Sequence, residues 1–181
     1  MTHLGLAPYR FDVSVLASQL EEHPEIWNEI PFRTEHPESP HRESSDIWVR
    51  YNRRDNYAGN MQTFNGEHVS EWYPVIAKIP AVIDLCWGLC LKERATLGGV
   101  LITKVPAGKQ IYPHVDGGWH AAVHEKFIIT VKGNERQSFN FDGESLSTIP
   151  GESFWFENAY PHWVKNESAE DRISLIVCIR R

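Results

Sequence analysis

GGVLITKVPAGKQIYPHVD, at residues 98–116, consists of two short apolar runs joined by the turn-forming segment PAGKQ. Runs of this length that are rich in β-branched residues and bounded by glycine and proline are typical of β-strands. The same texture continues to the C-terminus in KFIITVKG, QSFNFDG, ESLSTIPGESFWFEN, YPHWVKN and RISLIVCIRR. Many short strands at this spacing indicate an antiparallel barrel or sandwich.

The first 97 residues have a different pattern, which favours helices. Two amphipathic segments are DVSVLASQLEEHPEIW (12–27), interrupted by Pro24, and SEWYPVIAKIPAVIDLCWGLCLKE (70–93). In the second segment, the apolar residues that recur every three or four positions are Ile76, Ile79, Ile83 and Trp87. Between the two segments, DIWVRY (46–51) resembles a strand. We predict an α+β fold in which helices within residues 1–97 support a double-stranded β-helix, a cupin-like jelly roll, formed by residues 98–181.

Length, charge and cysteine content limit the class of protein. The 181 residues suffice for one core and are too few for two typical domains, so residues 1–181 are predicted to form a single domain. The net charge of −6 gives no overall attraction to nucleic acid. No apolar run suits a membrane span, no secretion signal is recognisable, and the three cysteines lie in apolar runs typical of buried thiols. We expect a cytoplasmic protein without nucleic-acid or membrane partners; the sequence indicates no oligomeric state.

His114 and Asp116 are predicted to begin a metal site. Residues i and i+2 of an extended strand point to the same face, so both side chains can reach one ion. The third ligand is expected from another strand, and His162, which like His114 follows a proline, is the candidate. Two imidazoles and one carboxylate leave positions open on the ion, as in non-haem Fe(II) oxygenases, whereas a structural zinc site takes a fourth protein ligand.

His120 and His124 have the i, i+4 spacing of a helical metal pair, but no glutamate lies between them to act as the base of a zinc protease. We therefore do not expect them to be primary ligands. Residues 117–125 are instead predicted to form a loop that covers the site, with Trp119 and His120 facing the substrate.

Arg172 begins the last predicted strand, ten residues after His162. An arginine that projects into a barrel is unfavourable unless it meets an anion, and its planar guanidinium suits a carboxylate. The alternative is an ordinary surface ion pair with Asp171, Glu170 or Glu167. Only the first interpretation gives Arg172 a role in binding an anionic co-substrate.

Three dispersed motifs together resemble the aspartyl/asparaginyl β-hydroxylase family. They are YPHVD (112–116), PGESFWFENAYPHWV (150–164) and DRISLIVCI (171–179), and the similar region spans about residues 98–181. Members of the family are Fe(II)- and 2-oxoglutarate-dependent oxygenases with a double-stranded β-helix, and they include small bacterial hydroxylases of free amino acids such as proline. The resemblance implies bound Fe(II), with 2-oxoglutarate and O2 as co-substrates.

The same resemblance assigns roles to individual residues. It makes His114, Asp116 and His162 the iron ligands, and it makes Arg172 the partner of the distal carboxylate of 2-oxoglutarate, assisted by the hydroxyl of Thr103. The family also has an Arg-x-His pair that contacts the metal-proximal end of the co-substrate. This pair corresponds here to Lys126 and Ile128, so only the positive charge of its first residue is kept.

Further residues are predicted to line a substrate pocket. PHRESSDIWVRY (40–51) is similar to a stretch of short bacterial and phage members of the family, which places His41, Arg42, Trp48 and Arg50 at the pocket mouth; a purely structural strand is the alternative. Aromatic residues near the ligands, Trp155 among them, suit a dry, walled cavity.

The resulting hypothesis is a dioxygenase that hydroxylates an unactivated C–H bond of an amino acid, an amino-acid residue or a related small polar molecule. Its partner would be a small-molecule or an aminoacyl or peptidyl substrate. One alternative is a non-enzymatic cupin-like module that binds a ligand, which would need neither the triad nor Arg172. The other is a cupin enzyme with zinc or another metal, which would need a fourth ligand from His120 or His124.

Overall fold

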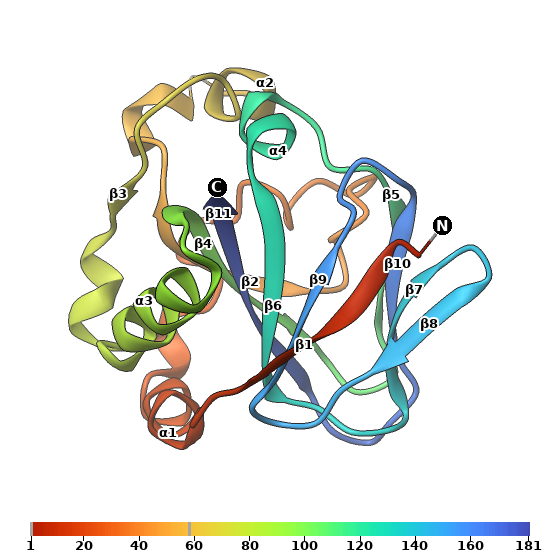
Figure 1. Ribbon diagram of the computed structural model, residues 1–181. Helices are drawn as coiled ribbons and strands as arrows, with labels where there is room; N and C mark the ends of the chain where they lie inside the picture. Colours follow the sequence, from red (N-terminus) through yellow and green to blue (C-terminus); the bar gives the residue numbers. More distant parts are fainter. Residues whose placement is uncertain (1, 58) are drawn as a thin grey trace.

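Two antiparallel sheets form the framework of the protein, for which a computed structural model describes residues 2–57 and 59–181 (Figure 1). The larger sheet has seven strands in the order β1-β9-β6-β11-β4-β2-β3, and the smaller has four in the order β5-β10-β7-β8. Their bounds are β1 Leu4–Arg10, β2 Ser45–Tyr51, β3 Glu71–Trp72, β4 Thr96–Val105, β5 Gln110–His114, β6 Glu125–Lys132, β7 Gln137–Phe141, β8 Glu144–Ser147, β9 Glu152–Phe156, β10 His162–Asn166 and β11 Arg172–Arg180. The two sheets enclose the interior of a double-stranded β-helix, so the predicted fold class is confirmed.

The two faces of the larger sheet have different roles, as its central strand β11 shows. Ile173, Leu175, Val177 and Ile179 point to one side and belong to the largest hydrophobic cluster. The alternate residues point to the other side, between the sheets. Of these, Ile176 and Cys178 line an internal cavity. Each fully buried aliphatic side chain contributes about 1.5–3 kcal/mol to stability, so the first face fixes the sheet and the second is available for a site.

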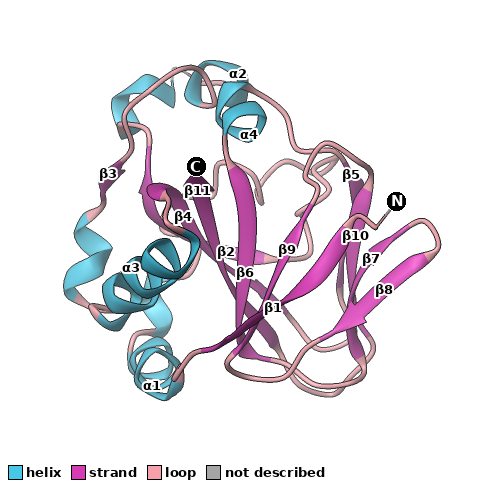
Figure 2. Cartoon of the chain, in the orientation of Figure 1, coloured by secondary structure: helices cyan, strands magenta, loops and turns pink. Residues whose placement is uncertain are grey.

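Helices cover that first face. They are α1 (Ser14–Glu22) and α3 (Ala81–Glu93), which Figure 2 shows on the side of the large sheet away from the small one. The remaining helical segments are η1 (Pro24–Ile26), η2 (Arg54–Tyr57), α2 (Met61–Phe64), η3 (Pro74–Ala77) and α4 (Trp119–Val123). Both predicted helical segments are therefore present, each interrupted at a proline. No helix in the described part of the chain combines the length and apolar character that crossing a bilayer requires.

The predicted apolar face of the second helical segment is only partly correct. Ile79 is fully buried, but Trp87 is 47% exposed. Helix α3 instead packs through Val82, Leu85, Cys86, Leu89 and Cys90. The reason is Pro80, which separates η3 from α3, so the periodicity before the proline does not continue in phase after it.

The first 97 residues also contribute strands β1, β2 and β3, although this region was predicted to be mainly a helical support. Strand β1 pairs with β9 at one edge of the larger sheet, and β2 pairs with β4 near the other edge. Strand β1 contains Gly5 and Pro8, which the sequence analysis did not recognise as part of a strand. An edge strand tolerates proline because one side of its backbone needs no sheet partner.

Candidate metal centre and cavity

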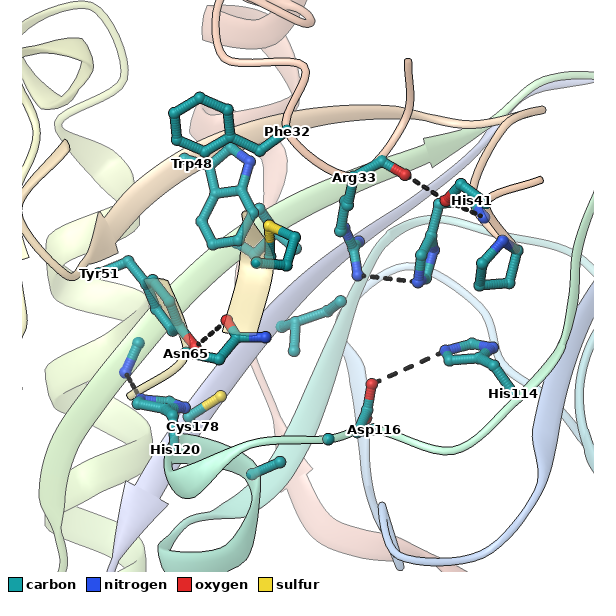
Figure 3. A pocket seen from close by; sticks show the side chains of 18 of the residues that line it. Phe32, Arg33, His41, Trp48, Tyr51, Asn65, His114, Asp116, His120 and Cys178 are labelled. Atoms are coloured by element: carbon teal, nitrogen blue, oxygen red, sulfur yellow. Dashed lines mark hydrogen bonds and ion pairs between the residues drawn. The ribbon is translucent and has the colours of Figure 1, made fainter. Parts of the chain in front are cut away.

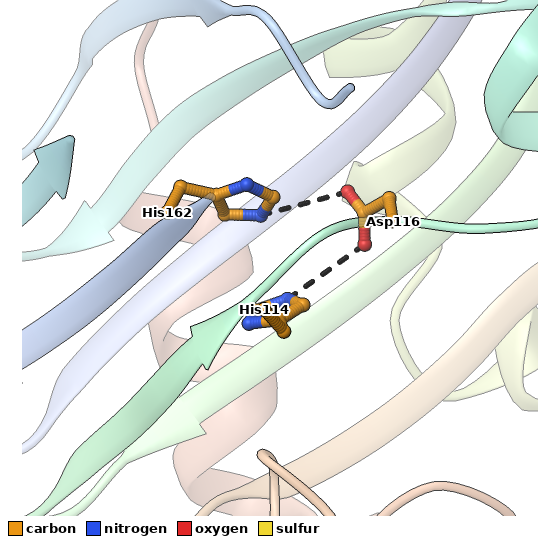
Figure 4. Close-up of side chains that lie close together, drawn as sticks. All are labelled: His114, Asp116 and His162. Atoms are coloured by element: carbon orange, nitrogen blue, oxygen red, sulfur yellow. Dashed lines mark ion pairs between the residues drawn. The ribbon is translucent and has the colours of Figure 1, made fainter. Parts of the chain in front are cut away.

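His114, Asp116 and His162 meet where β5 and β10 pair (Figure 4). The antiparallel register puts His162 opposite His114, and Asp116 lies two residues beyond the end of β5 rather than on the strand. The Nε2 atom of His114 is 3.7 Å from Oδ1 of Asp116, and the Nε2 atom of His162 is 3.6 Å from Oδ2. One ligand atom from each residue lies within 4.8 Å of the others, and within residues 2–57 and 59–181 no other group of histidine, cysteine or acidic residues meets this condition.

Hydrogen bonds hold both histidines in the form that binds a metal. The Nδ1–H of His114 donates to the carbonyl oxygen of Tyr112 at 2.8 Å, and that of His162 donates to the carbonyl oxygen of Tyr160 at 2.8 Å. Each ring therefore keeps its Nε2 lone pair free for an ion. Burial lowers the pKa of His114 to about 4 and also lowers the pKa of His162, so both rings are neutral near pH 7.

Asp116 is held as a carboxylate by its neighbours. Burial by itself raises its pKa, but the positive charge of Lys126 and the nearby rings of His162 and His114 outweigh burial and bring the pKa to about 2. Lys126, at the start of β6, places its Nζ atom 2.6 Å from Oδ2 of Asp116. Ile128, two residues further along β6, is buried in the apolar interior. Two neutral imidazoles and one carboxylate are a donor set that suits Fe(II).

A cavity of about 510 Å³ opens beside these ligands (Figure 3). His114, Asp116 and Lys126 form one part of its wall. Other parts of the wall come from the interior faces of β2, β4 and β11, from helix α4 through His120 and Ala121, and from two segments of the N-terminal half, around residues 32–41 and 59–65. The aromatic side chains of the wall are Phe32, Trp48, Tyr51 and Tyr57.

Of the residues predicted for the pocket, His41, Trp48 and His120 line this cavity and four others do not. Arg42 is exposed, with its guanidinium over the ring of Tyr112. Arg50 donates to the carbonyl oxygen of Gly98, and Trp119 packs against histidines 68, 120 and 124. None of these three side chains lines the cavity, and their predicted role at a substrate pocket stays a prediction.

Trp155 was predicted to line the substrate cavity, but its side chain lies on the other face of the larger sheet. It packs with the hydrophobic cluster on the helix-covered side of the larger sheet, whereas its neighbours Phe154 and Phe156 belong to the cluster between the sheets. Because side chains alternate along a strand, the residue between two interior phenylalanines must face outward.

Arg33 is a cavity residue that the sequence analysis missed. It makes a two-point contact with the fully buried carboxylate of Asp46, at 2.5 and 3.0 Å. Its Nη2 atom also donates to the hydroxyl of Thr103 at 2.8 Å, and its Nη1 atom lies 3.3 Å from Nε2 of His41. Burial is the largest single influence and lowers the pKa of Arg33, but the charge of Asp46, its hydrogen bonds and the charge of Asp116 together raise the pKa above its ordinary value. Arg33 comes from an irregular loop, and no local pattern indicates that it folds into the interior.

Arg172 is buried between the sheets, with 4% of its surface exposed. Its Nη1 atom donates to the hydroxyl of Ser174 at 2.6 Å. No carboxylate in the described part of the chain forms an ion pair with it, and burial lowers its pKa to about 10. The surface ion pair with Asp171, Glu170 or Glu167 is therefore excluded. The hydroxyl of Thr103, which the family resemblance pairs with Arg172, instead donates to Asp46 and accepts from Arg33.

Comparisons with known proteins agree with this geometry. The sequence profile of the aspartyl/asparaginyl beta-hydroxylase family matches residues 21–181. No curated protein matches the sequence. A 2OG-Fe(II) oxygenase family oxidoreductase from Burkholderia pseudomallei shares the fold with a TM-score of 0.55 and 14% identity, over 99% of this chain and 95% of that one. A viral collagen prolyl hydroxylase from Paramecium Bursaria Chlorella virus-1 also shares the fold, with a TM-score of 0.54 and 11% identity, over 98% of this chain and 96% of that one.

The family match covers most of the chain, including all three motifs that resemble the family and both sheets except β1. It also includes the triad, Lys126 and Arg172. The chain therefore belongs to the aspartyl/asparaginyl β-hydroxylase family and is a 2-oxoglutarate-dependent hydroxylase, which uses Fe(II) as its cofactor and 2-oxoglutarate and O2 as co-substrates.

Proposed function

We propose that the chain hydroxylates an unactivated C–H bond of an amino acid, an amino-acid residue or a related small polar molecule that binds in the 510 Å³ cavity. The observation that carries this proposal is that His114 and Asp116 form part of the cavity wall. A cavity of this size suits a small molecule or one side chain. A molecule bound there lies directly beside the metal centre.

In this proposal His114, Asp116 and His162 hold Fe(II) through two Nε2 atoms and a carboxylate oxygen. The chemistry that Fe(II) supplies when bound is the decarboxylation of 2-oxoglutarate to succinate and CO2, coupled to transfer of one oxygen atom of O2 to a C–H bond. The backbone carbonyls of Tyr112 and Tyr160 keep both imidazoles aimed at the ion.

Arg172 and Ser174 hold the distal carboxylate of 2-oxoglutarate in this proposal. A fully buried guanidinium without a carboxylate partner is unfavourable unless an anion meets it. Both side chains point to the same side of β11 as Ile176 and Cys178, which line the cavity. At the other end of the co-substrate, Lys126 supplies a positive charge beside Asp116 and attracts the proximal carboxylate.

The aromatic wall limits access of water to the reacting C–H bond. Trp48 is 6% and Tyr51 is 9% exposed, and both rings contact Phe64, which is fully buried. Phe32 stacks on Tyr57 with ring centroids 3.7 Å apart. Such a wall strengthens the interactions of the charged groups and suppresses side reactions with water.

The first test is binding of 2-oxoglutarate to the anaerobic Fe(II) protein, followed through the weak visible charge-transfer absorption of the complex. We expect the absorption in the wild type, its loss in His162→Ala and a need for much more 2-oxoglutarate in Arg172→Ala. The matched control is Arg42→Ala, which removes an exposed arginine outside the cavity. Absence of the absorption in a metal-loaded wild type, or an equal effect of both arginine variants, would refute the proposed site.

The substrate class is tested with the same protein in air. Succinate release and a mass gain of one oxygen atom in the probe are measured for free amino acids and for short peptides that contain the same residues. Oxygen transfer to either set supports the proposal. Oxygen transfer confined to molecules of another class, such as apolar hydrocarbons, would contradict it.

A further inference from the structure

A third hydrophobic cluster borders the cavity, separate from the cluster under the helices and from the one between the sheets. Its members that line the cavity are Phe32, Trp48, Tyr51, Tyr57, Met61 and Leu101. We call these side chains the apolar wall. Figure 3 shows Phe32, Trp48 and Tyr51 on the side of the cavity opposite His114. A largely apolar surface therefore faces the free volume beside the metal centre.

The apolar wall is held in place by the elements that carry it. Trp48 and Tyr51 belong to β2, and Leu101 belongs to the neighbouring strand β4. The ring centroids of Trp48 and Tyr51 are 5.0 Å apart, and those of Trp48 and Phe32 are 6.5 Å apart. Side chains that are already ordered lose little freedom when a ligand binds. The apolar surface is therefore formed before a substrate arrives.

The cations of the cavity wall already have carboxylate partners. Arg33 is bound to Asp46, and Lys126 is bound to Asp116. Arg172 is not part of this wall, and in the proposed function it holds 2-oxoglutarate. A negatively charged side chain of a substrate would therefore find no free arginine or lysine in the part of the wall that the structure describes.

Neighbouring polar side chains of the cavity are neutral or negative. Asn65 is neutral, and Oδ1 of its amide accepts a hydrogen bond from the hydroxyl of Tyr51 at 2.9 Å. Burial lowers the pKa of both His41 and His120, so these two rings carry no charge near pH 7. Glu38 adds a carboxylate, which would repel a second one. These groups can form hydrogen bonds with a substrate, but they cannot neutralise a negative charge.

Both features of the cavity favour the same kind of side chain. An apolar side chain that covers the wall gains about 25 cal/mol for each Å² of apolar surface removed from water. An ionised side chain in the same place loses its hydration without gaining a counter-ion, which costs several kcal/mol. A carboxamide lies between the two, because it is neutral but gives up hydrogen bonds to water.

We propose that the apolar wall is the side-chain pocket for the substrate and selects an apolar side chain over a carboxylate or carboxamide of the same size. This inference rests on the proposed function and narrows its substrate class to amino acids, or residues of a peptide, that carry an apolar side chain. Aspartyl and asparaginyl residues, after which the family is named, are expected to bind less well in this cavity.

The test compares the binding of four probes to the anaerobic Fe(II) protein with 2-oxoglutarate bound. Leucine, asparagine and aspartate branch at the same carbon atom but differ in polarity and charge, and lysine carries a cation that aromatic rings can also bind. Each probe is used as the free amino acid and as the N-acetyl methylamide, and calorimetry gives the dissociation constants.

In at least one of the two forms, leucine should bind most tightly, with asparagine second and aspartate at least about tenfold weaker than leucine. If another probe binds as tightly as leucine in both forms, or if none binds, the proposal is overturned. Tightest binding of lysine would show that the rings recognise a cation instead.

Two substitutions show whether the apolar wall causes this preference. Phe32→Ser removes one ring of the wall and should lower the ratio of the leucine affinity to the aspartate affinity by about fivefold. Its matched control, Trp87→Ser, removes a half-exposed ring outside the cavity and should leave the ratio unchanged. Met61→Lys adds a cation to the wall and should lower the ratio by raising the affinity for aspartate. Met61→Leu keeps the apolar character and should keep the ratio.

A ratio that stays at the wild-type value in both Phe32→Ser and Met61→Lys would overturn the proposal, as would an equal effect of Trp87→Ser. The charge-transfer absorption of the 2-oxoglutarate complex is recorded in every sample. Its absence in the metal-loaded wild type means that the proposed function fails. A normal absorption without a preference for leucine means that only the role of the apolar wall fails.

Discussion

His114 and His162 face each other across the β5–β10 pair, and each donates its Nδ1–H to the carbonyl oxygen of the tyrosine two residues earlier, in both cases at 2.8 Å. Both belong to a Tyr-Pro-His sequence. The proline between tyrosine and histidine restricts the backbone and offers no competing N–H. The same local device therefore orients two ligands that are 48 positions apart in the numbering, from 114 to 162.

A more flexible backbone in a Tyr-Pro-His segment should weaken metal binding, although no ligand is removed. For Pro161→Gly we expect the affinity for Co(II), used as a spectroscopic substitute for Fe(II), to fall by about 10-fold, in the range typical for partners that orient ligands. The measurement is a titration of d–d absorption. Pro106→Gly, in a turn away from the ligands, is the control and should bind as the wild type does; equal effects of the two substitutions would show that general flexibility is responsible.

Arg172→Met should stabilise the protein in the absence of 2-oxoglutarate. Methionine removes a buried, unpaired guanidinium, and we expect the free energy of unfolding to rise by about 1–3 kcal/mol in urea denaturation. The increase in melting temperature that 2-oxoglutarate causes in the metal-loaded wild type should be lost. A variant that is destabilised and still responds to 2-oxoglutarate would assign Arg172 a structural role instead.

The free energy of unfolding should fall strongly when one member of the Arg33–Asp46 pair is removed. The side chain of Arg33 is 16% exposed and that of Asp46 is fully buried. Asp46→Asn leaves a buried charge without its counter-ion and should lower the free energy of unfolding by about 3–5 kcal/mol. The combined variant Arg33→Met with Asp46→Leu should lose less than the sum of the single variants.

The exposed pair of Arg10 and Glu152 provides the comparison for that measurement, since the side chain of Arg10 is 66% exposed. Glu152→Gln should change the free energy of unfolding by less than about 1 kcal/mol. If Glu152→Gln and Asp46→Asn both change the free energy of unfolding by a similarly small amount, the charge of Arg33 is compensated by a group other than Asp46.

His120 should make stability depend on pH in the mildly acidic range. Its pKa is about 2 in the folded protein and about 6.5 in an unfolded chain. Above pH of about 6.5 the ring is neutral in both states. As the pH falls below this value, the unfolded state takes up a proton that the folded state does not, so the free energy of unfolding falls by about 1.4 kcal/mol per pH unit.

In His120→Phe this contribution should be absent. Urea denaturation of the metal-free proteins is measured at about pH 6 and about pH 4.5. Between these pH values, the free energy of unfolding should fall by about 2 kcal/mol less in the variant than in the wild type. The comparison uses the difference between two pH values, so a constant effect of the substitution cancels. Equal losses in both proteins would mean that His120 is protonated in the folded state.

The sequence predicts the part of the fold and site that local patterns encode. Strand β11 alternates apolar residues with a clear period of two, and both histidine ligands follow prolines at strand ends. Trp155 was assigned to the wrong face because an aromatic run, FWF, has no alternation in hydrophobicity, and a shift of one residue reverses the face of a strand. Arg33 was missed because a loop carries it, and only the packing of distant segments brings it to the cavity.

Strand β11 is the last strand in the chain, yet it lies in the middle of the larger sheet, between β6 and β4. During synthesis, β4 and β6 leave the ribosome well before the strand that joins them, and each has an open edge until residues 172–180 emerge. Both edges then remain exposed to chaperones and to pairing with other chains. Because Arg172 lies on this strand, the nascent chain completes its sheet and gains the arginine proposed to hold 2-oxoglutarate in one folding event.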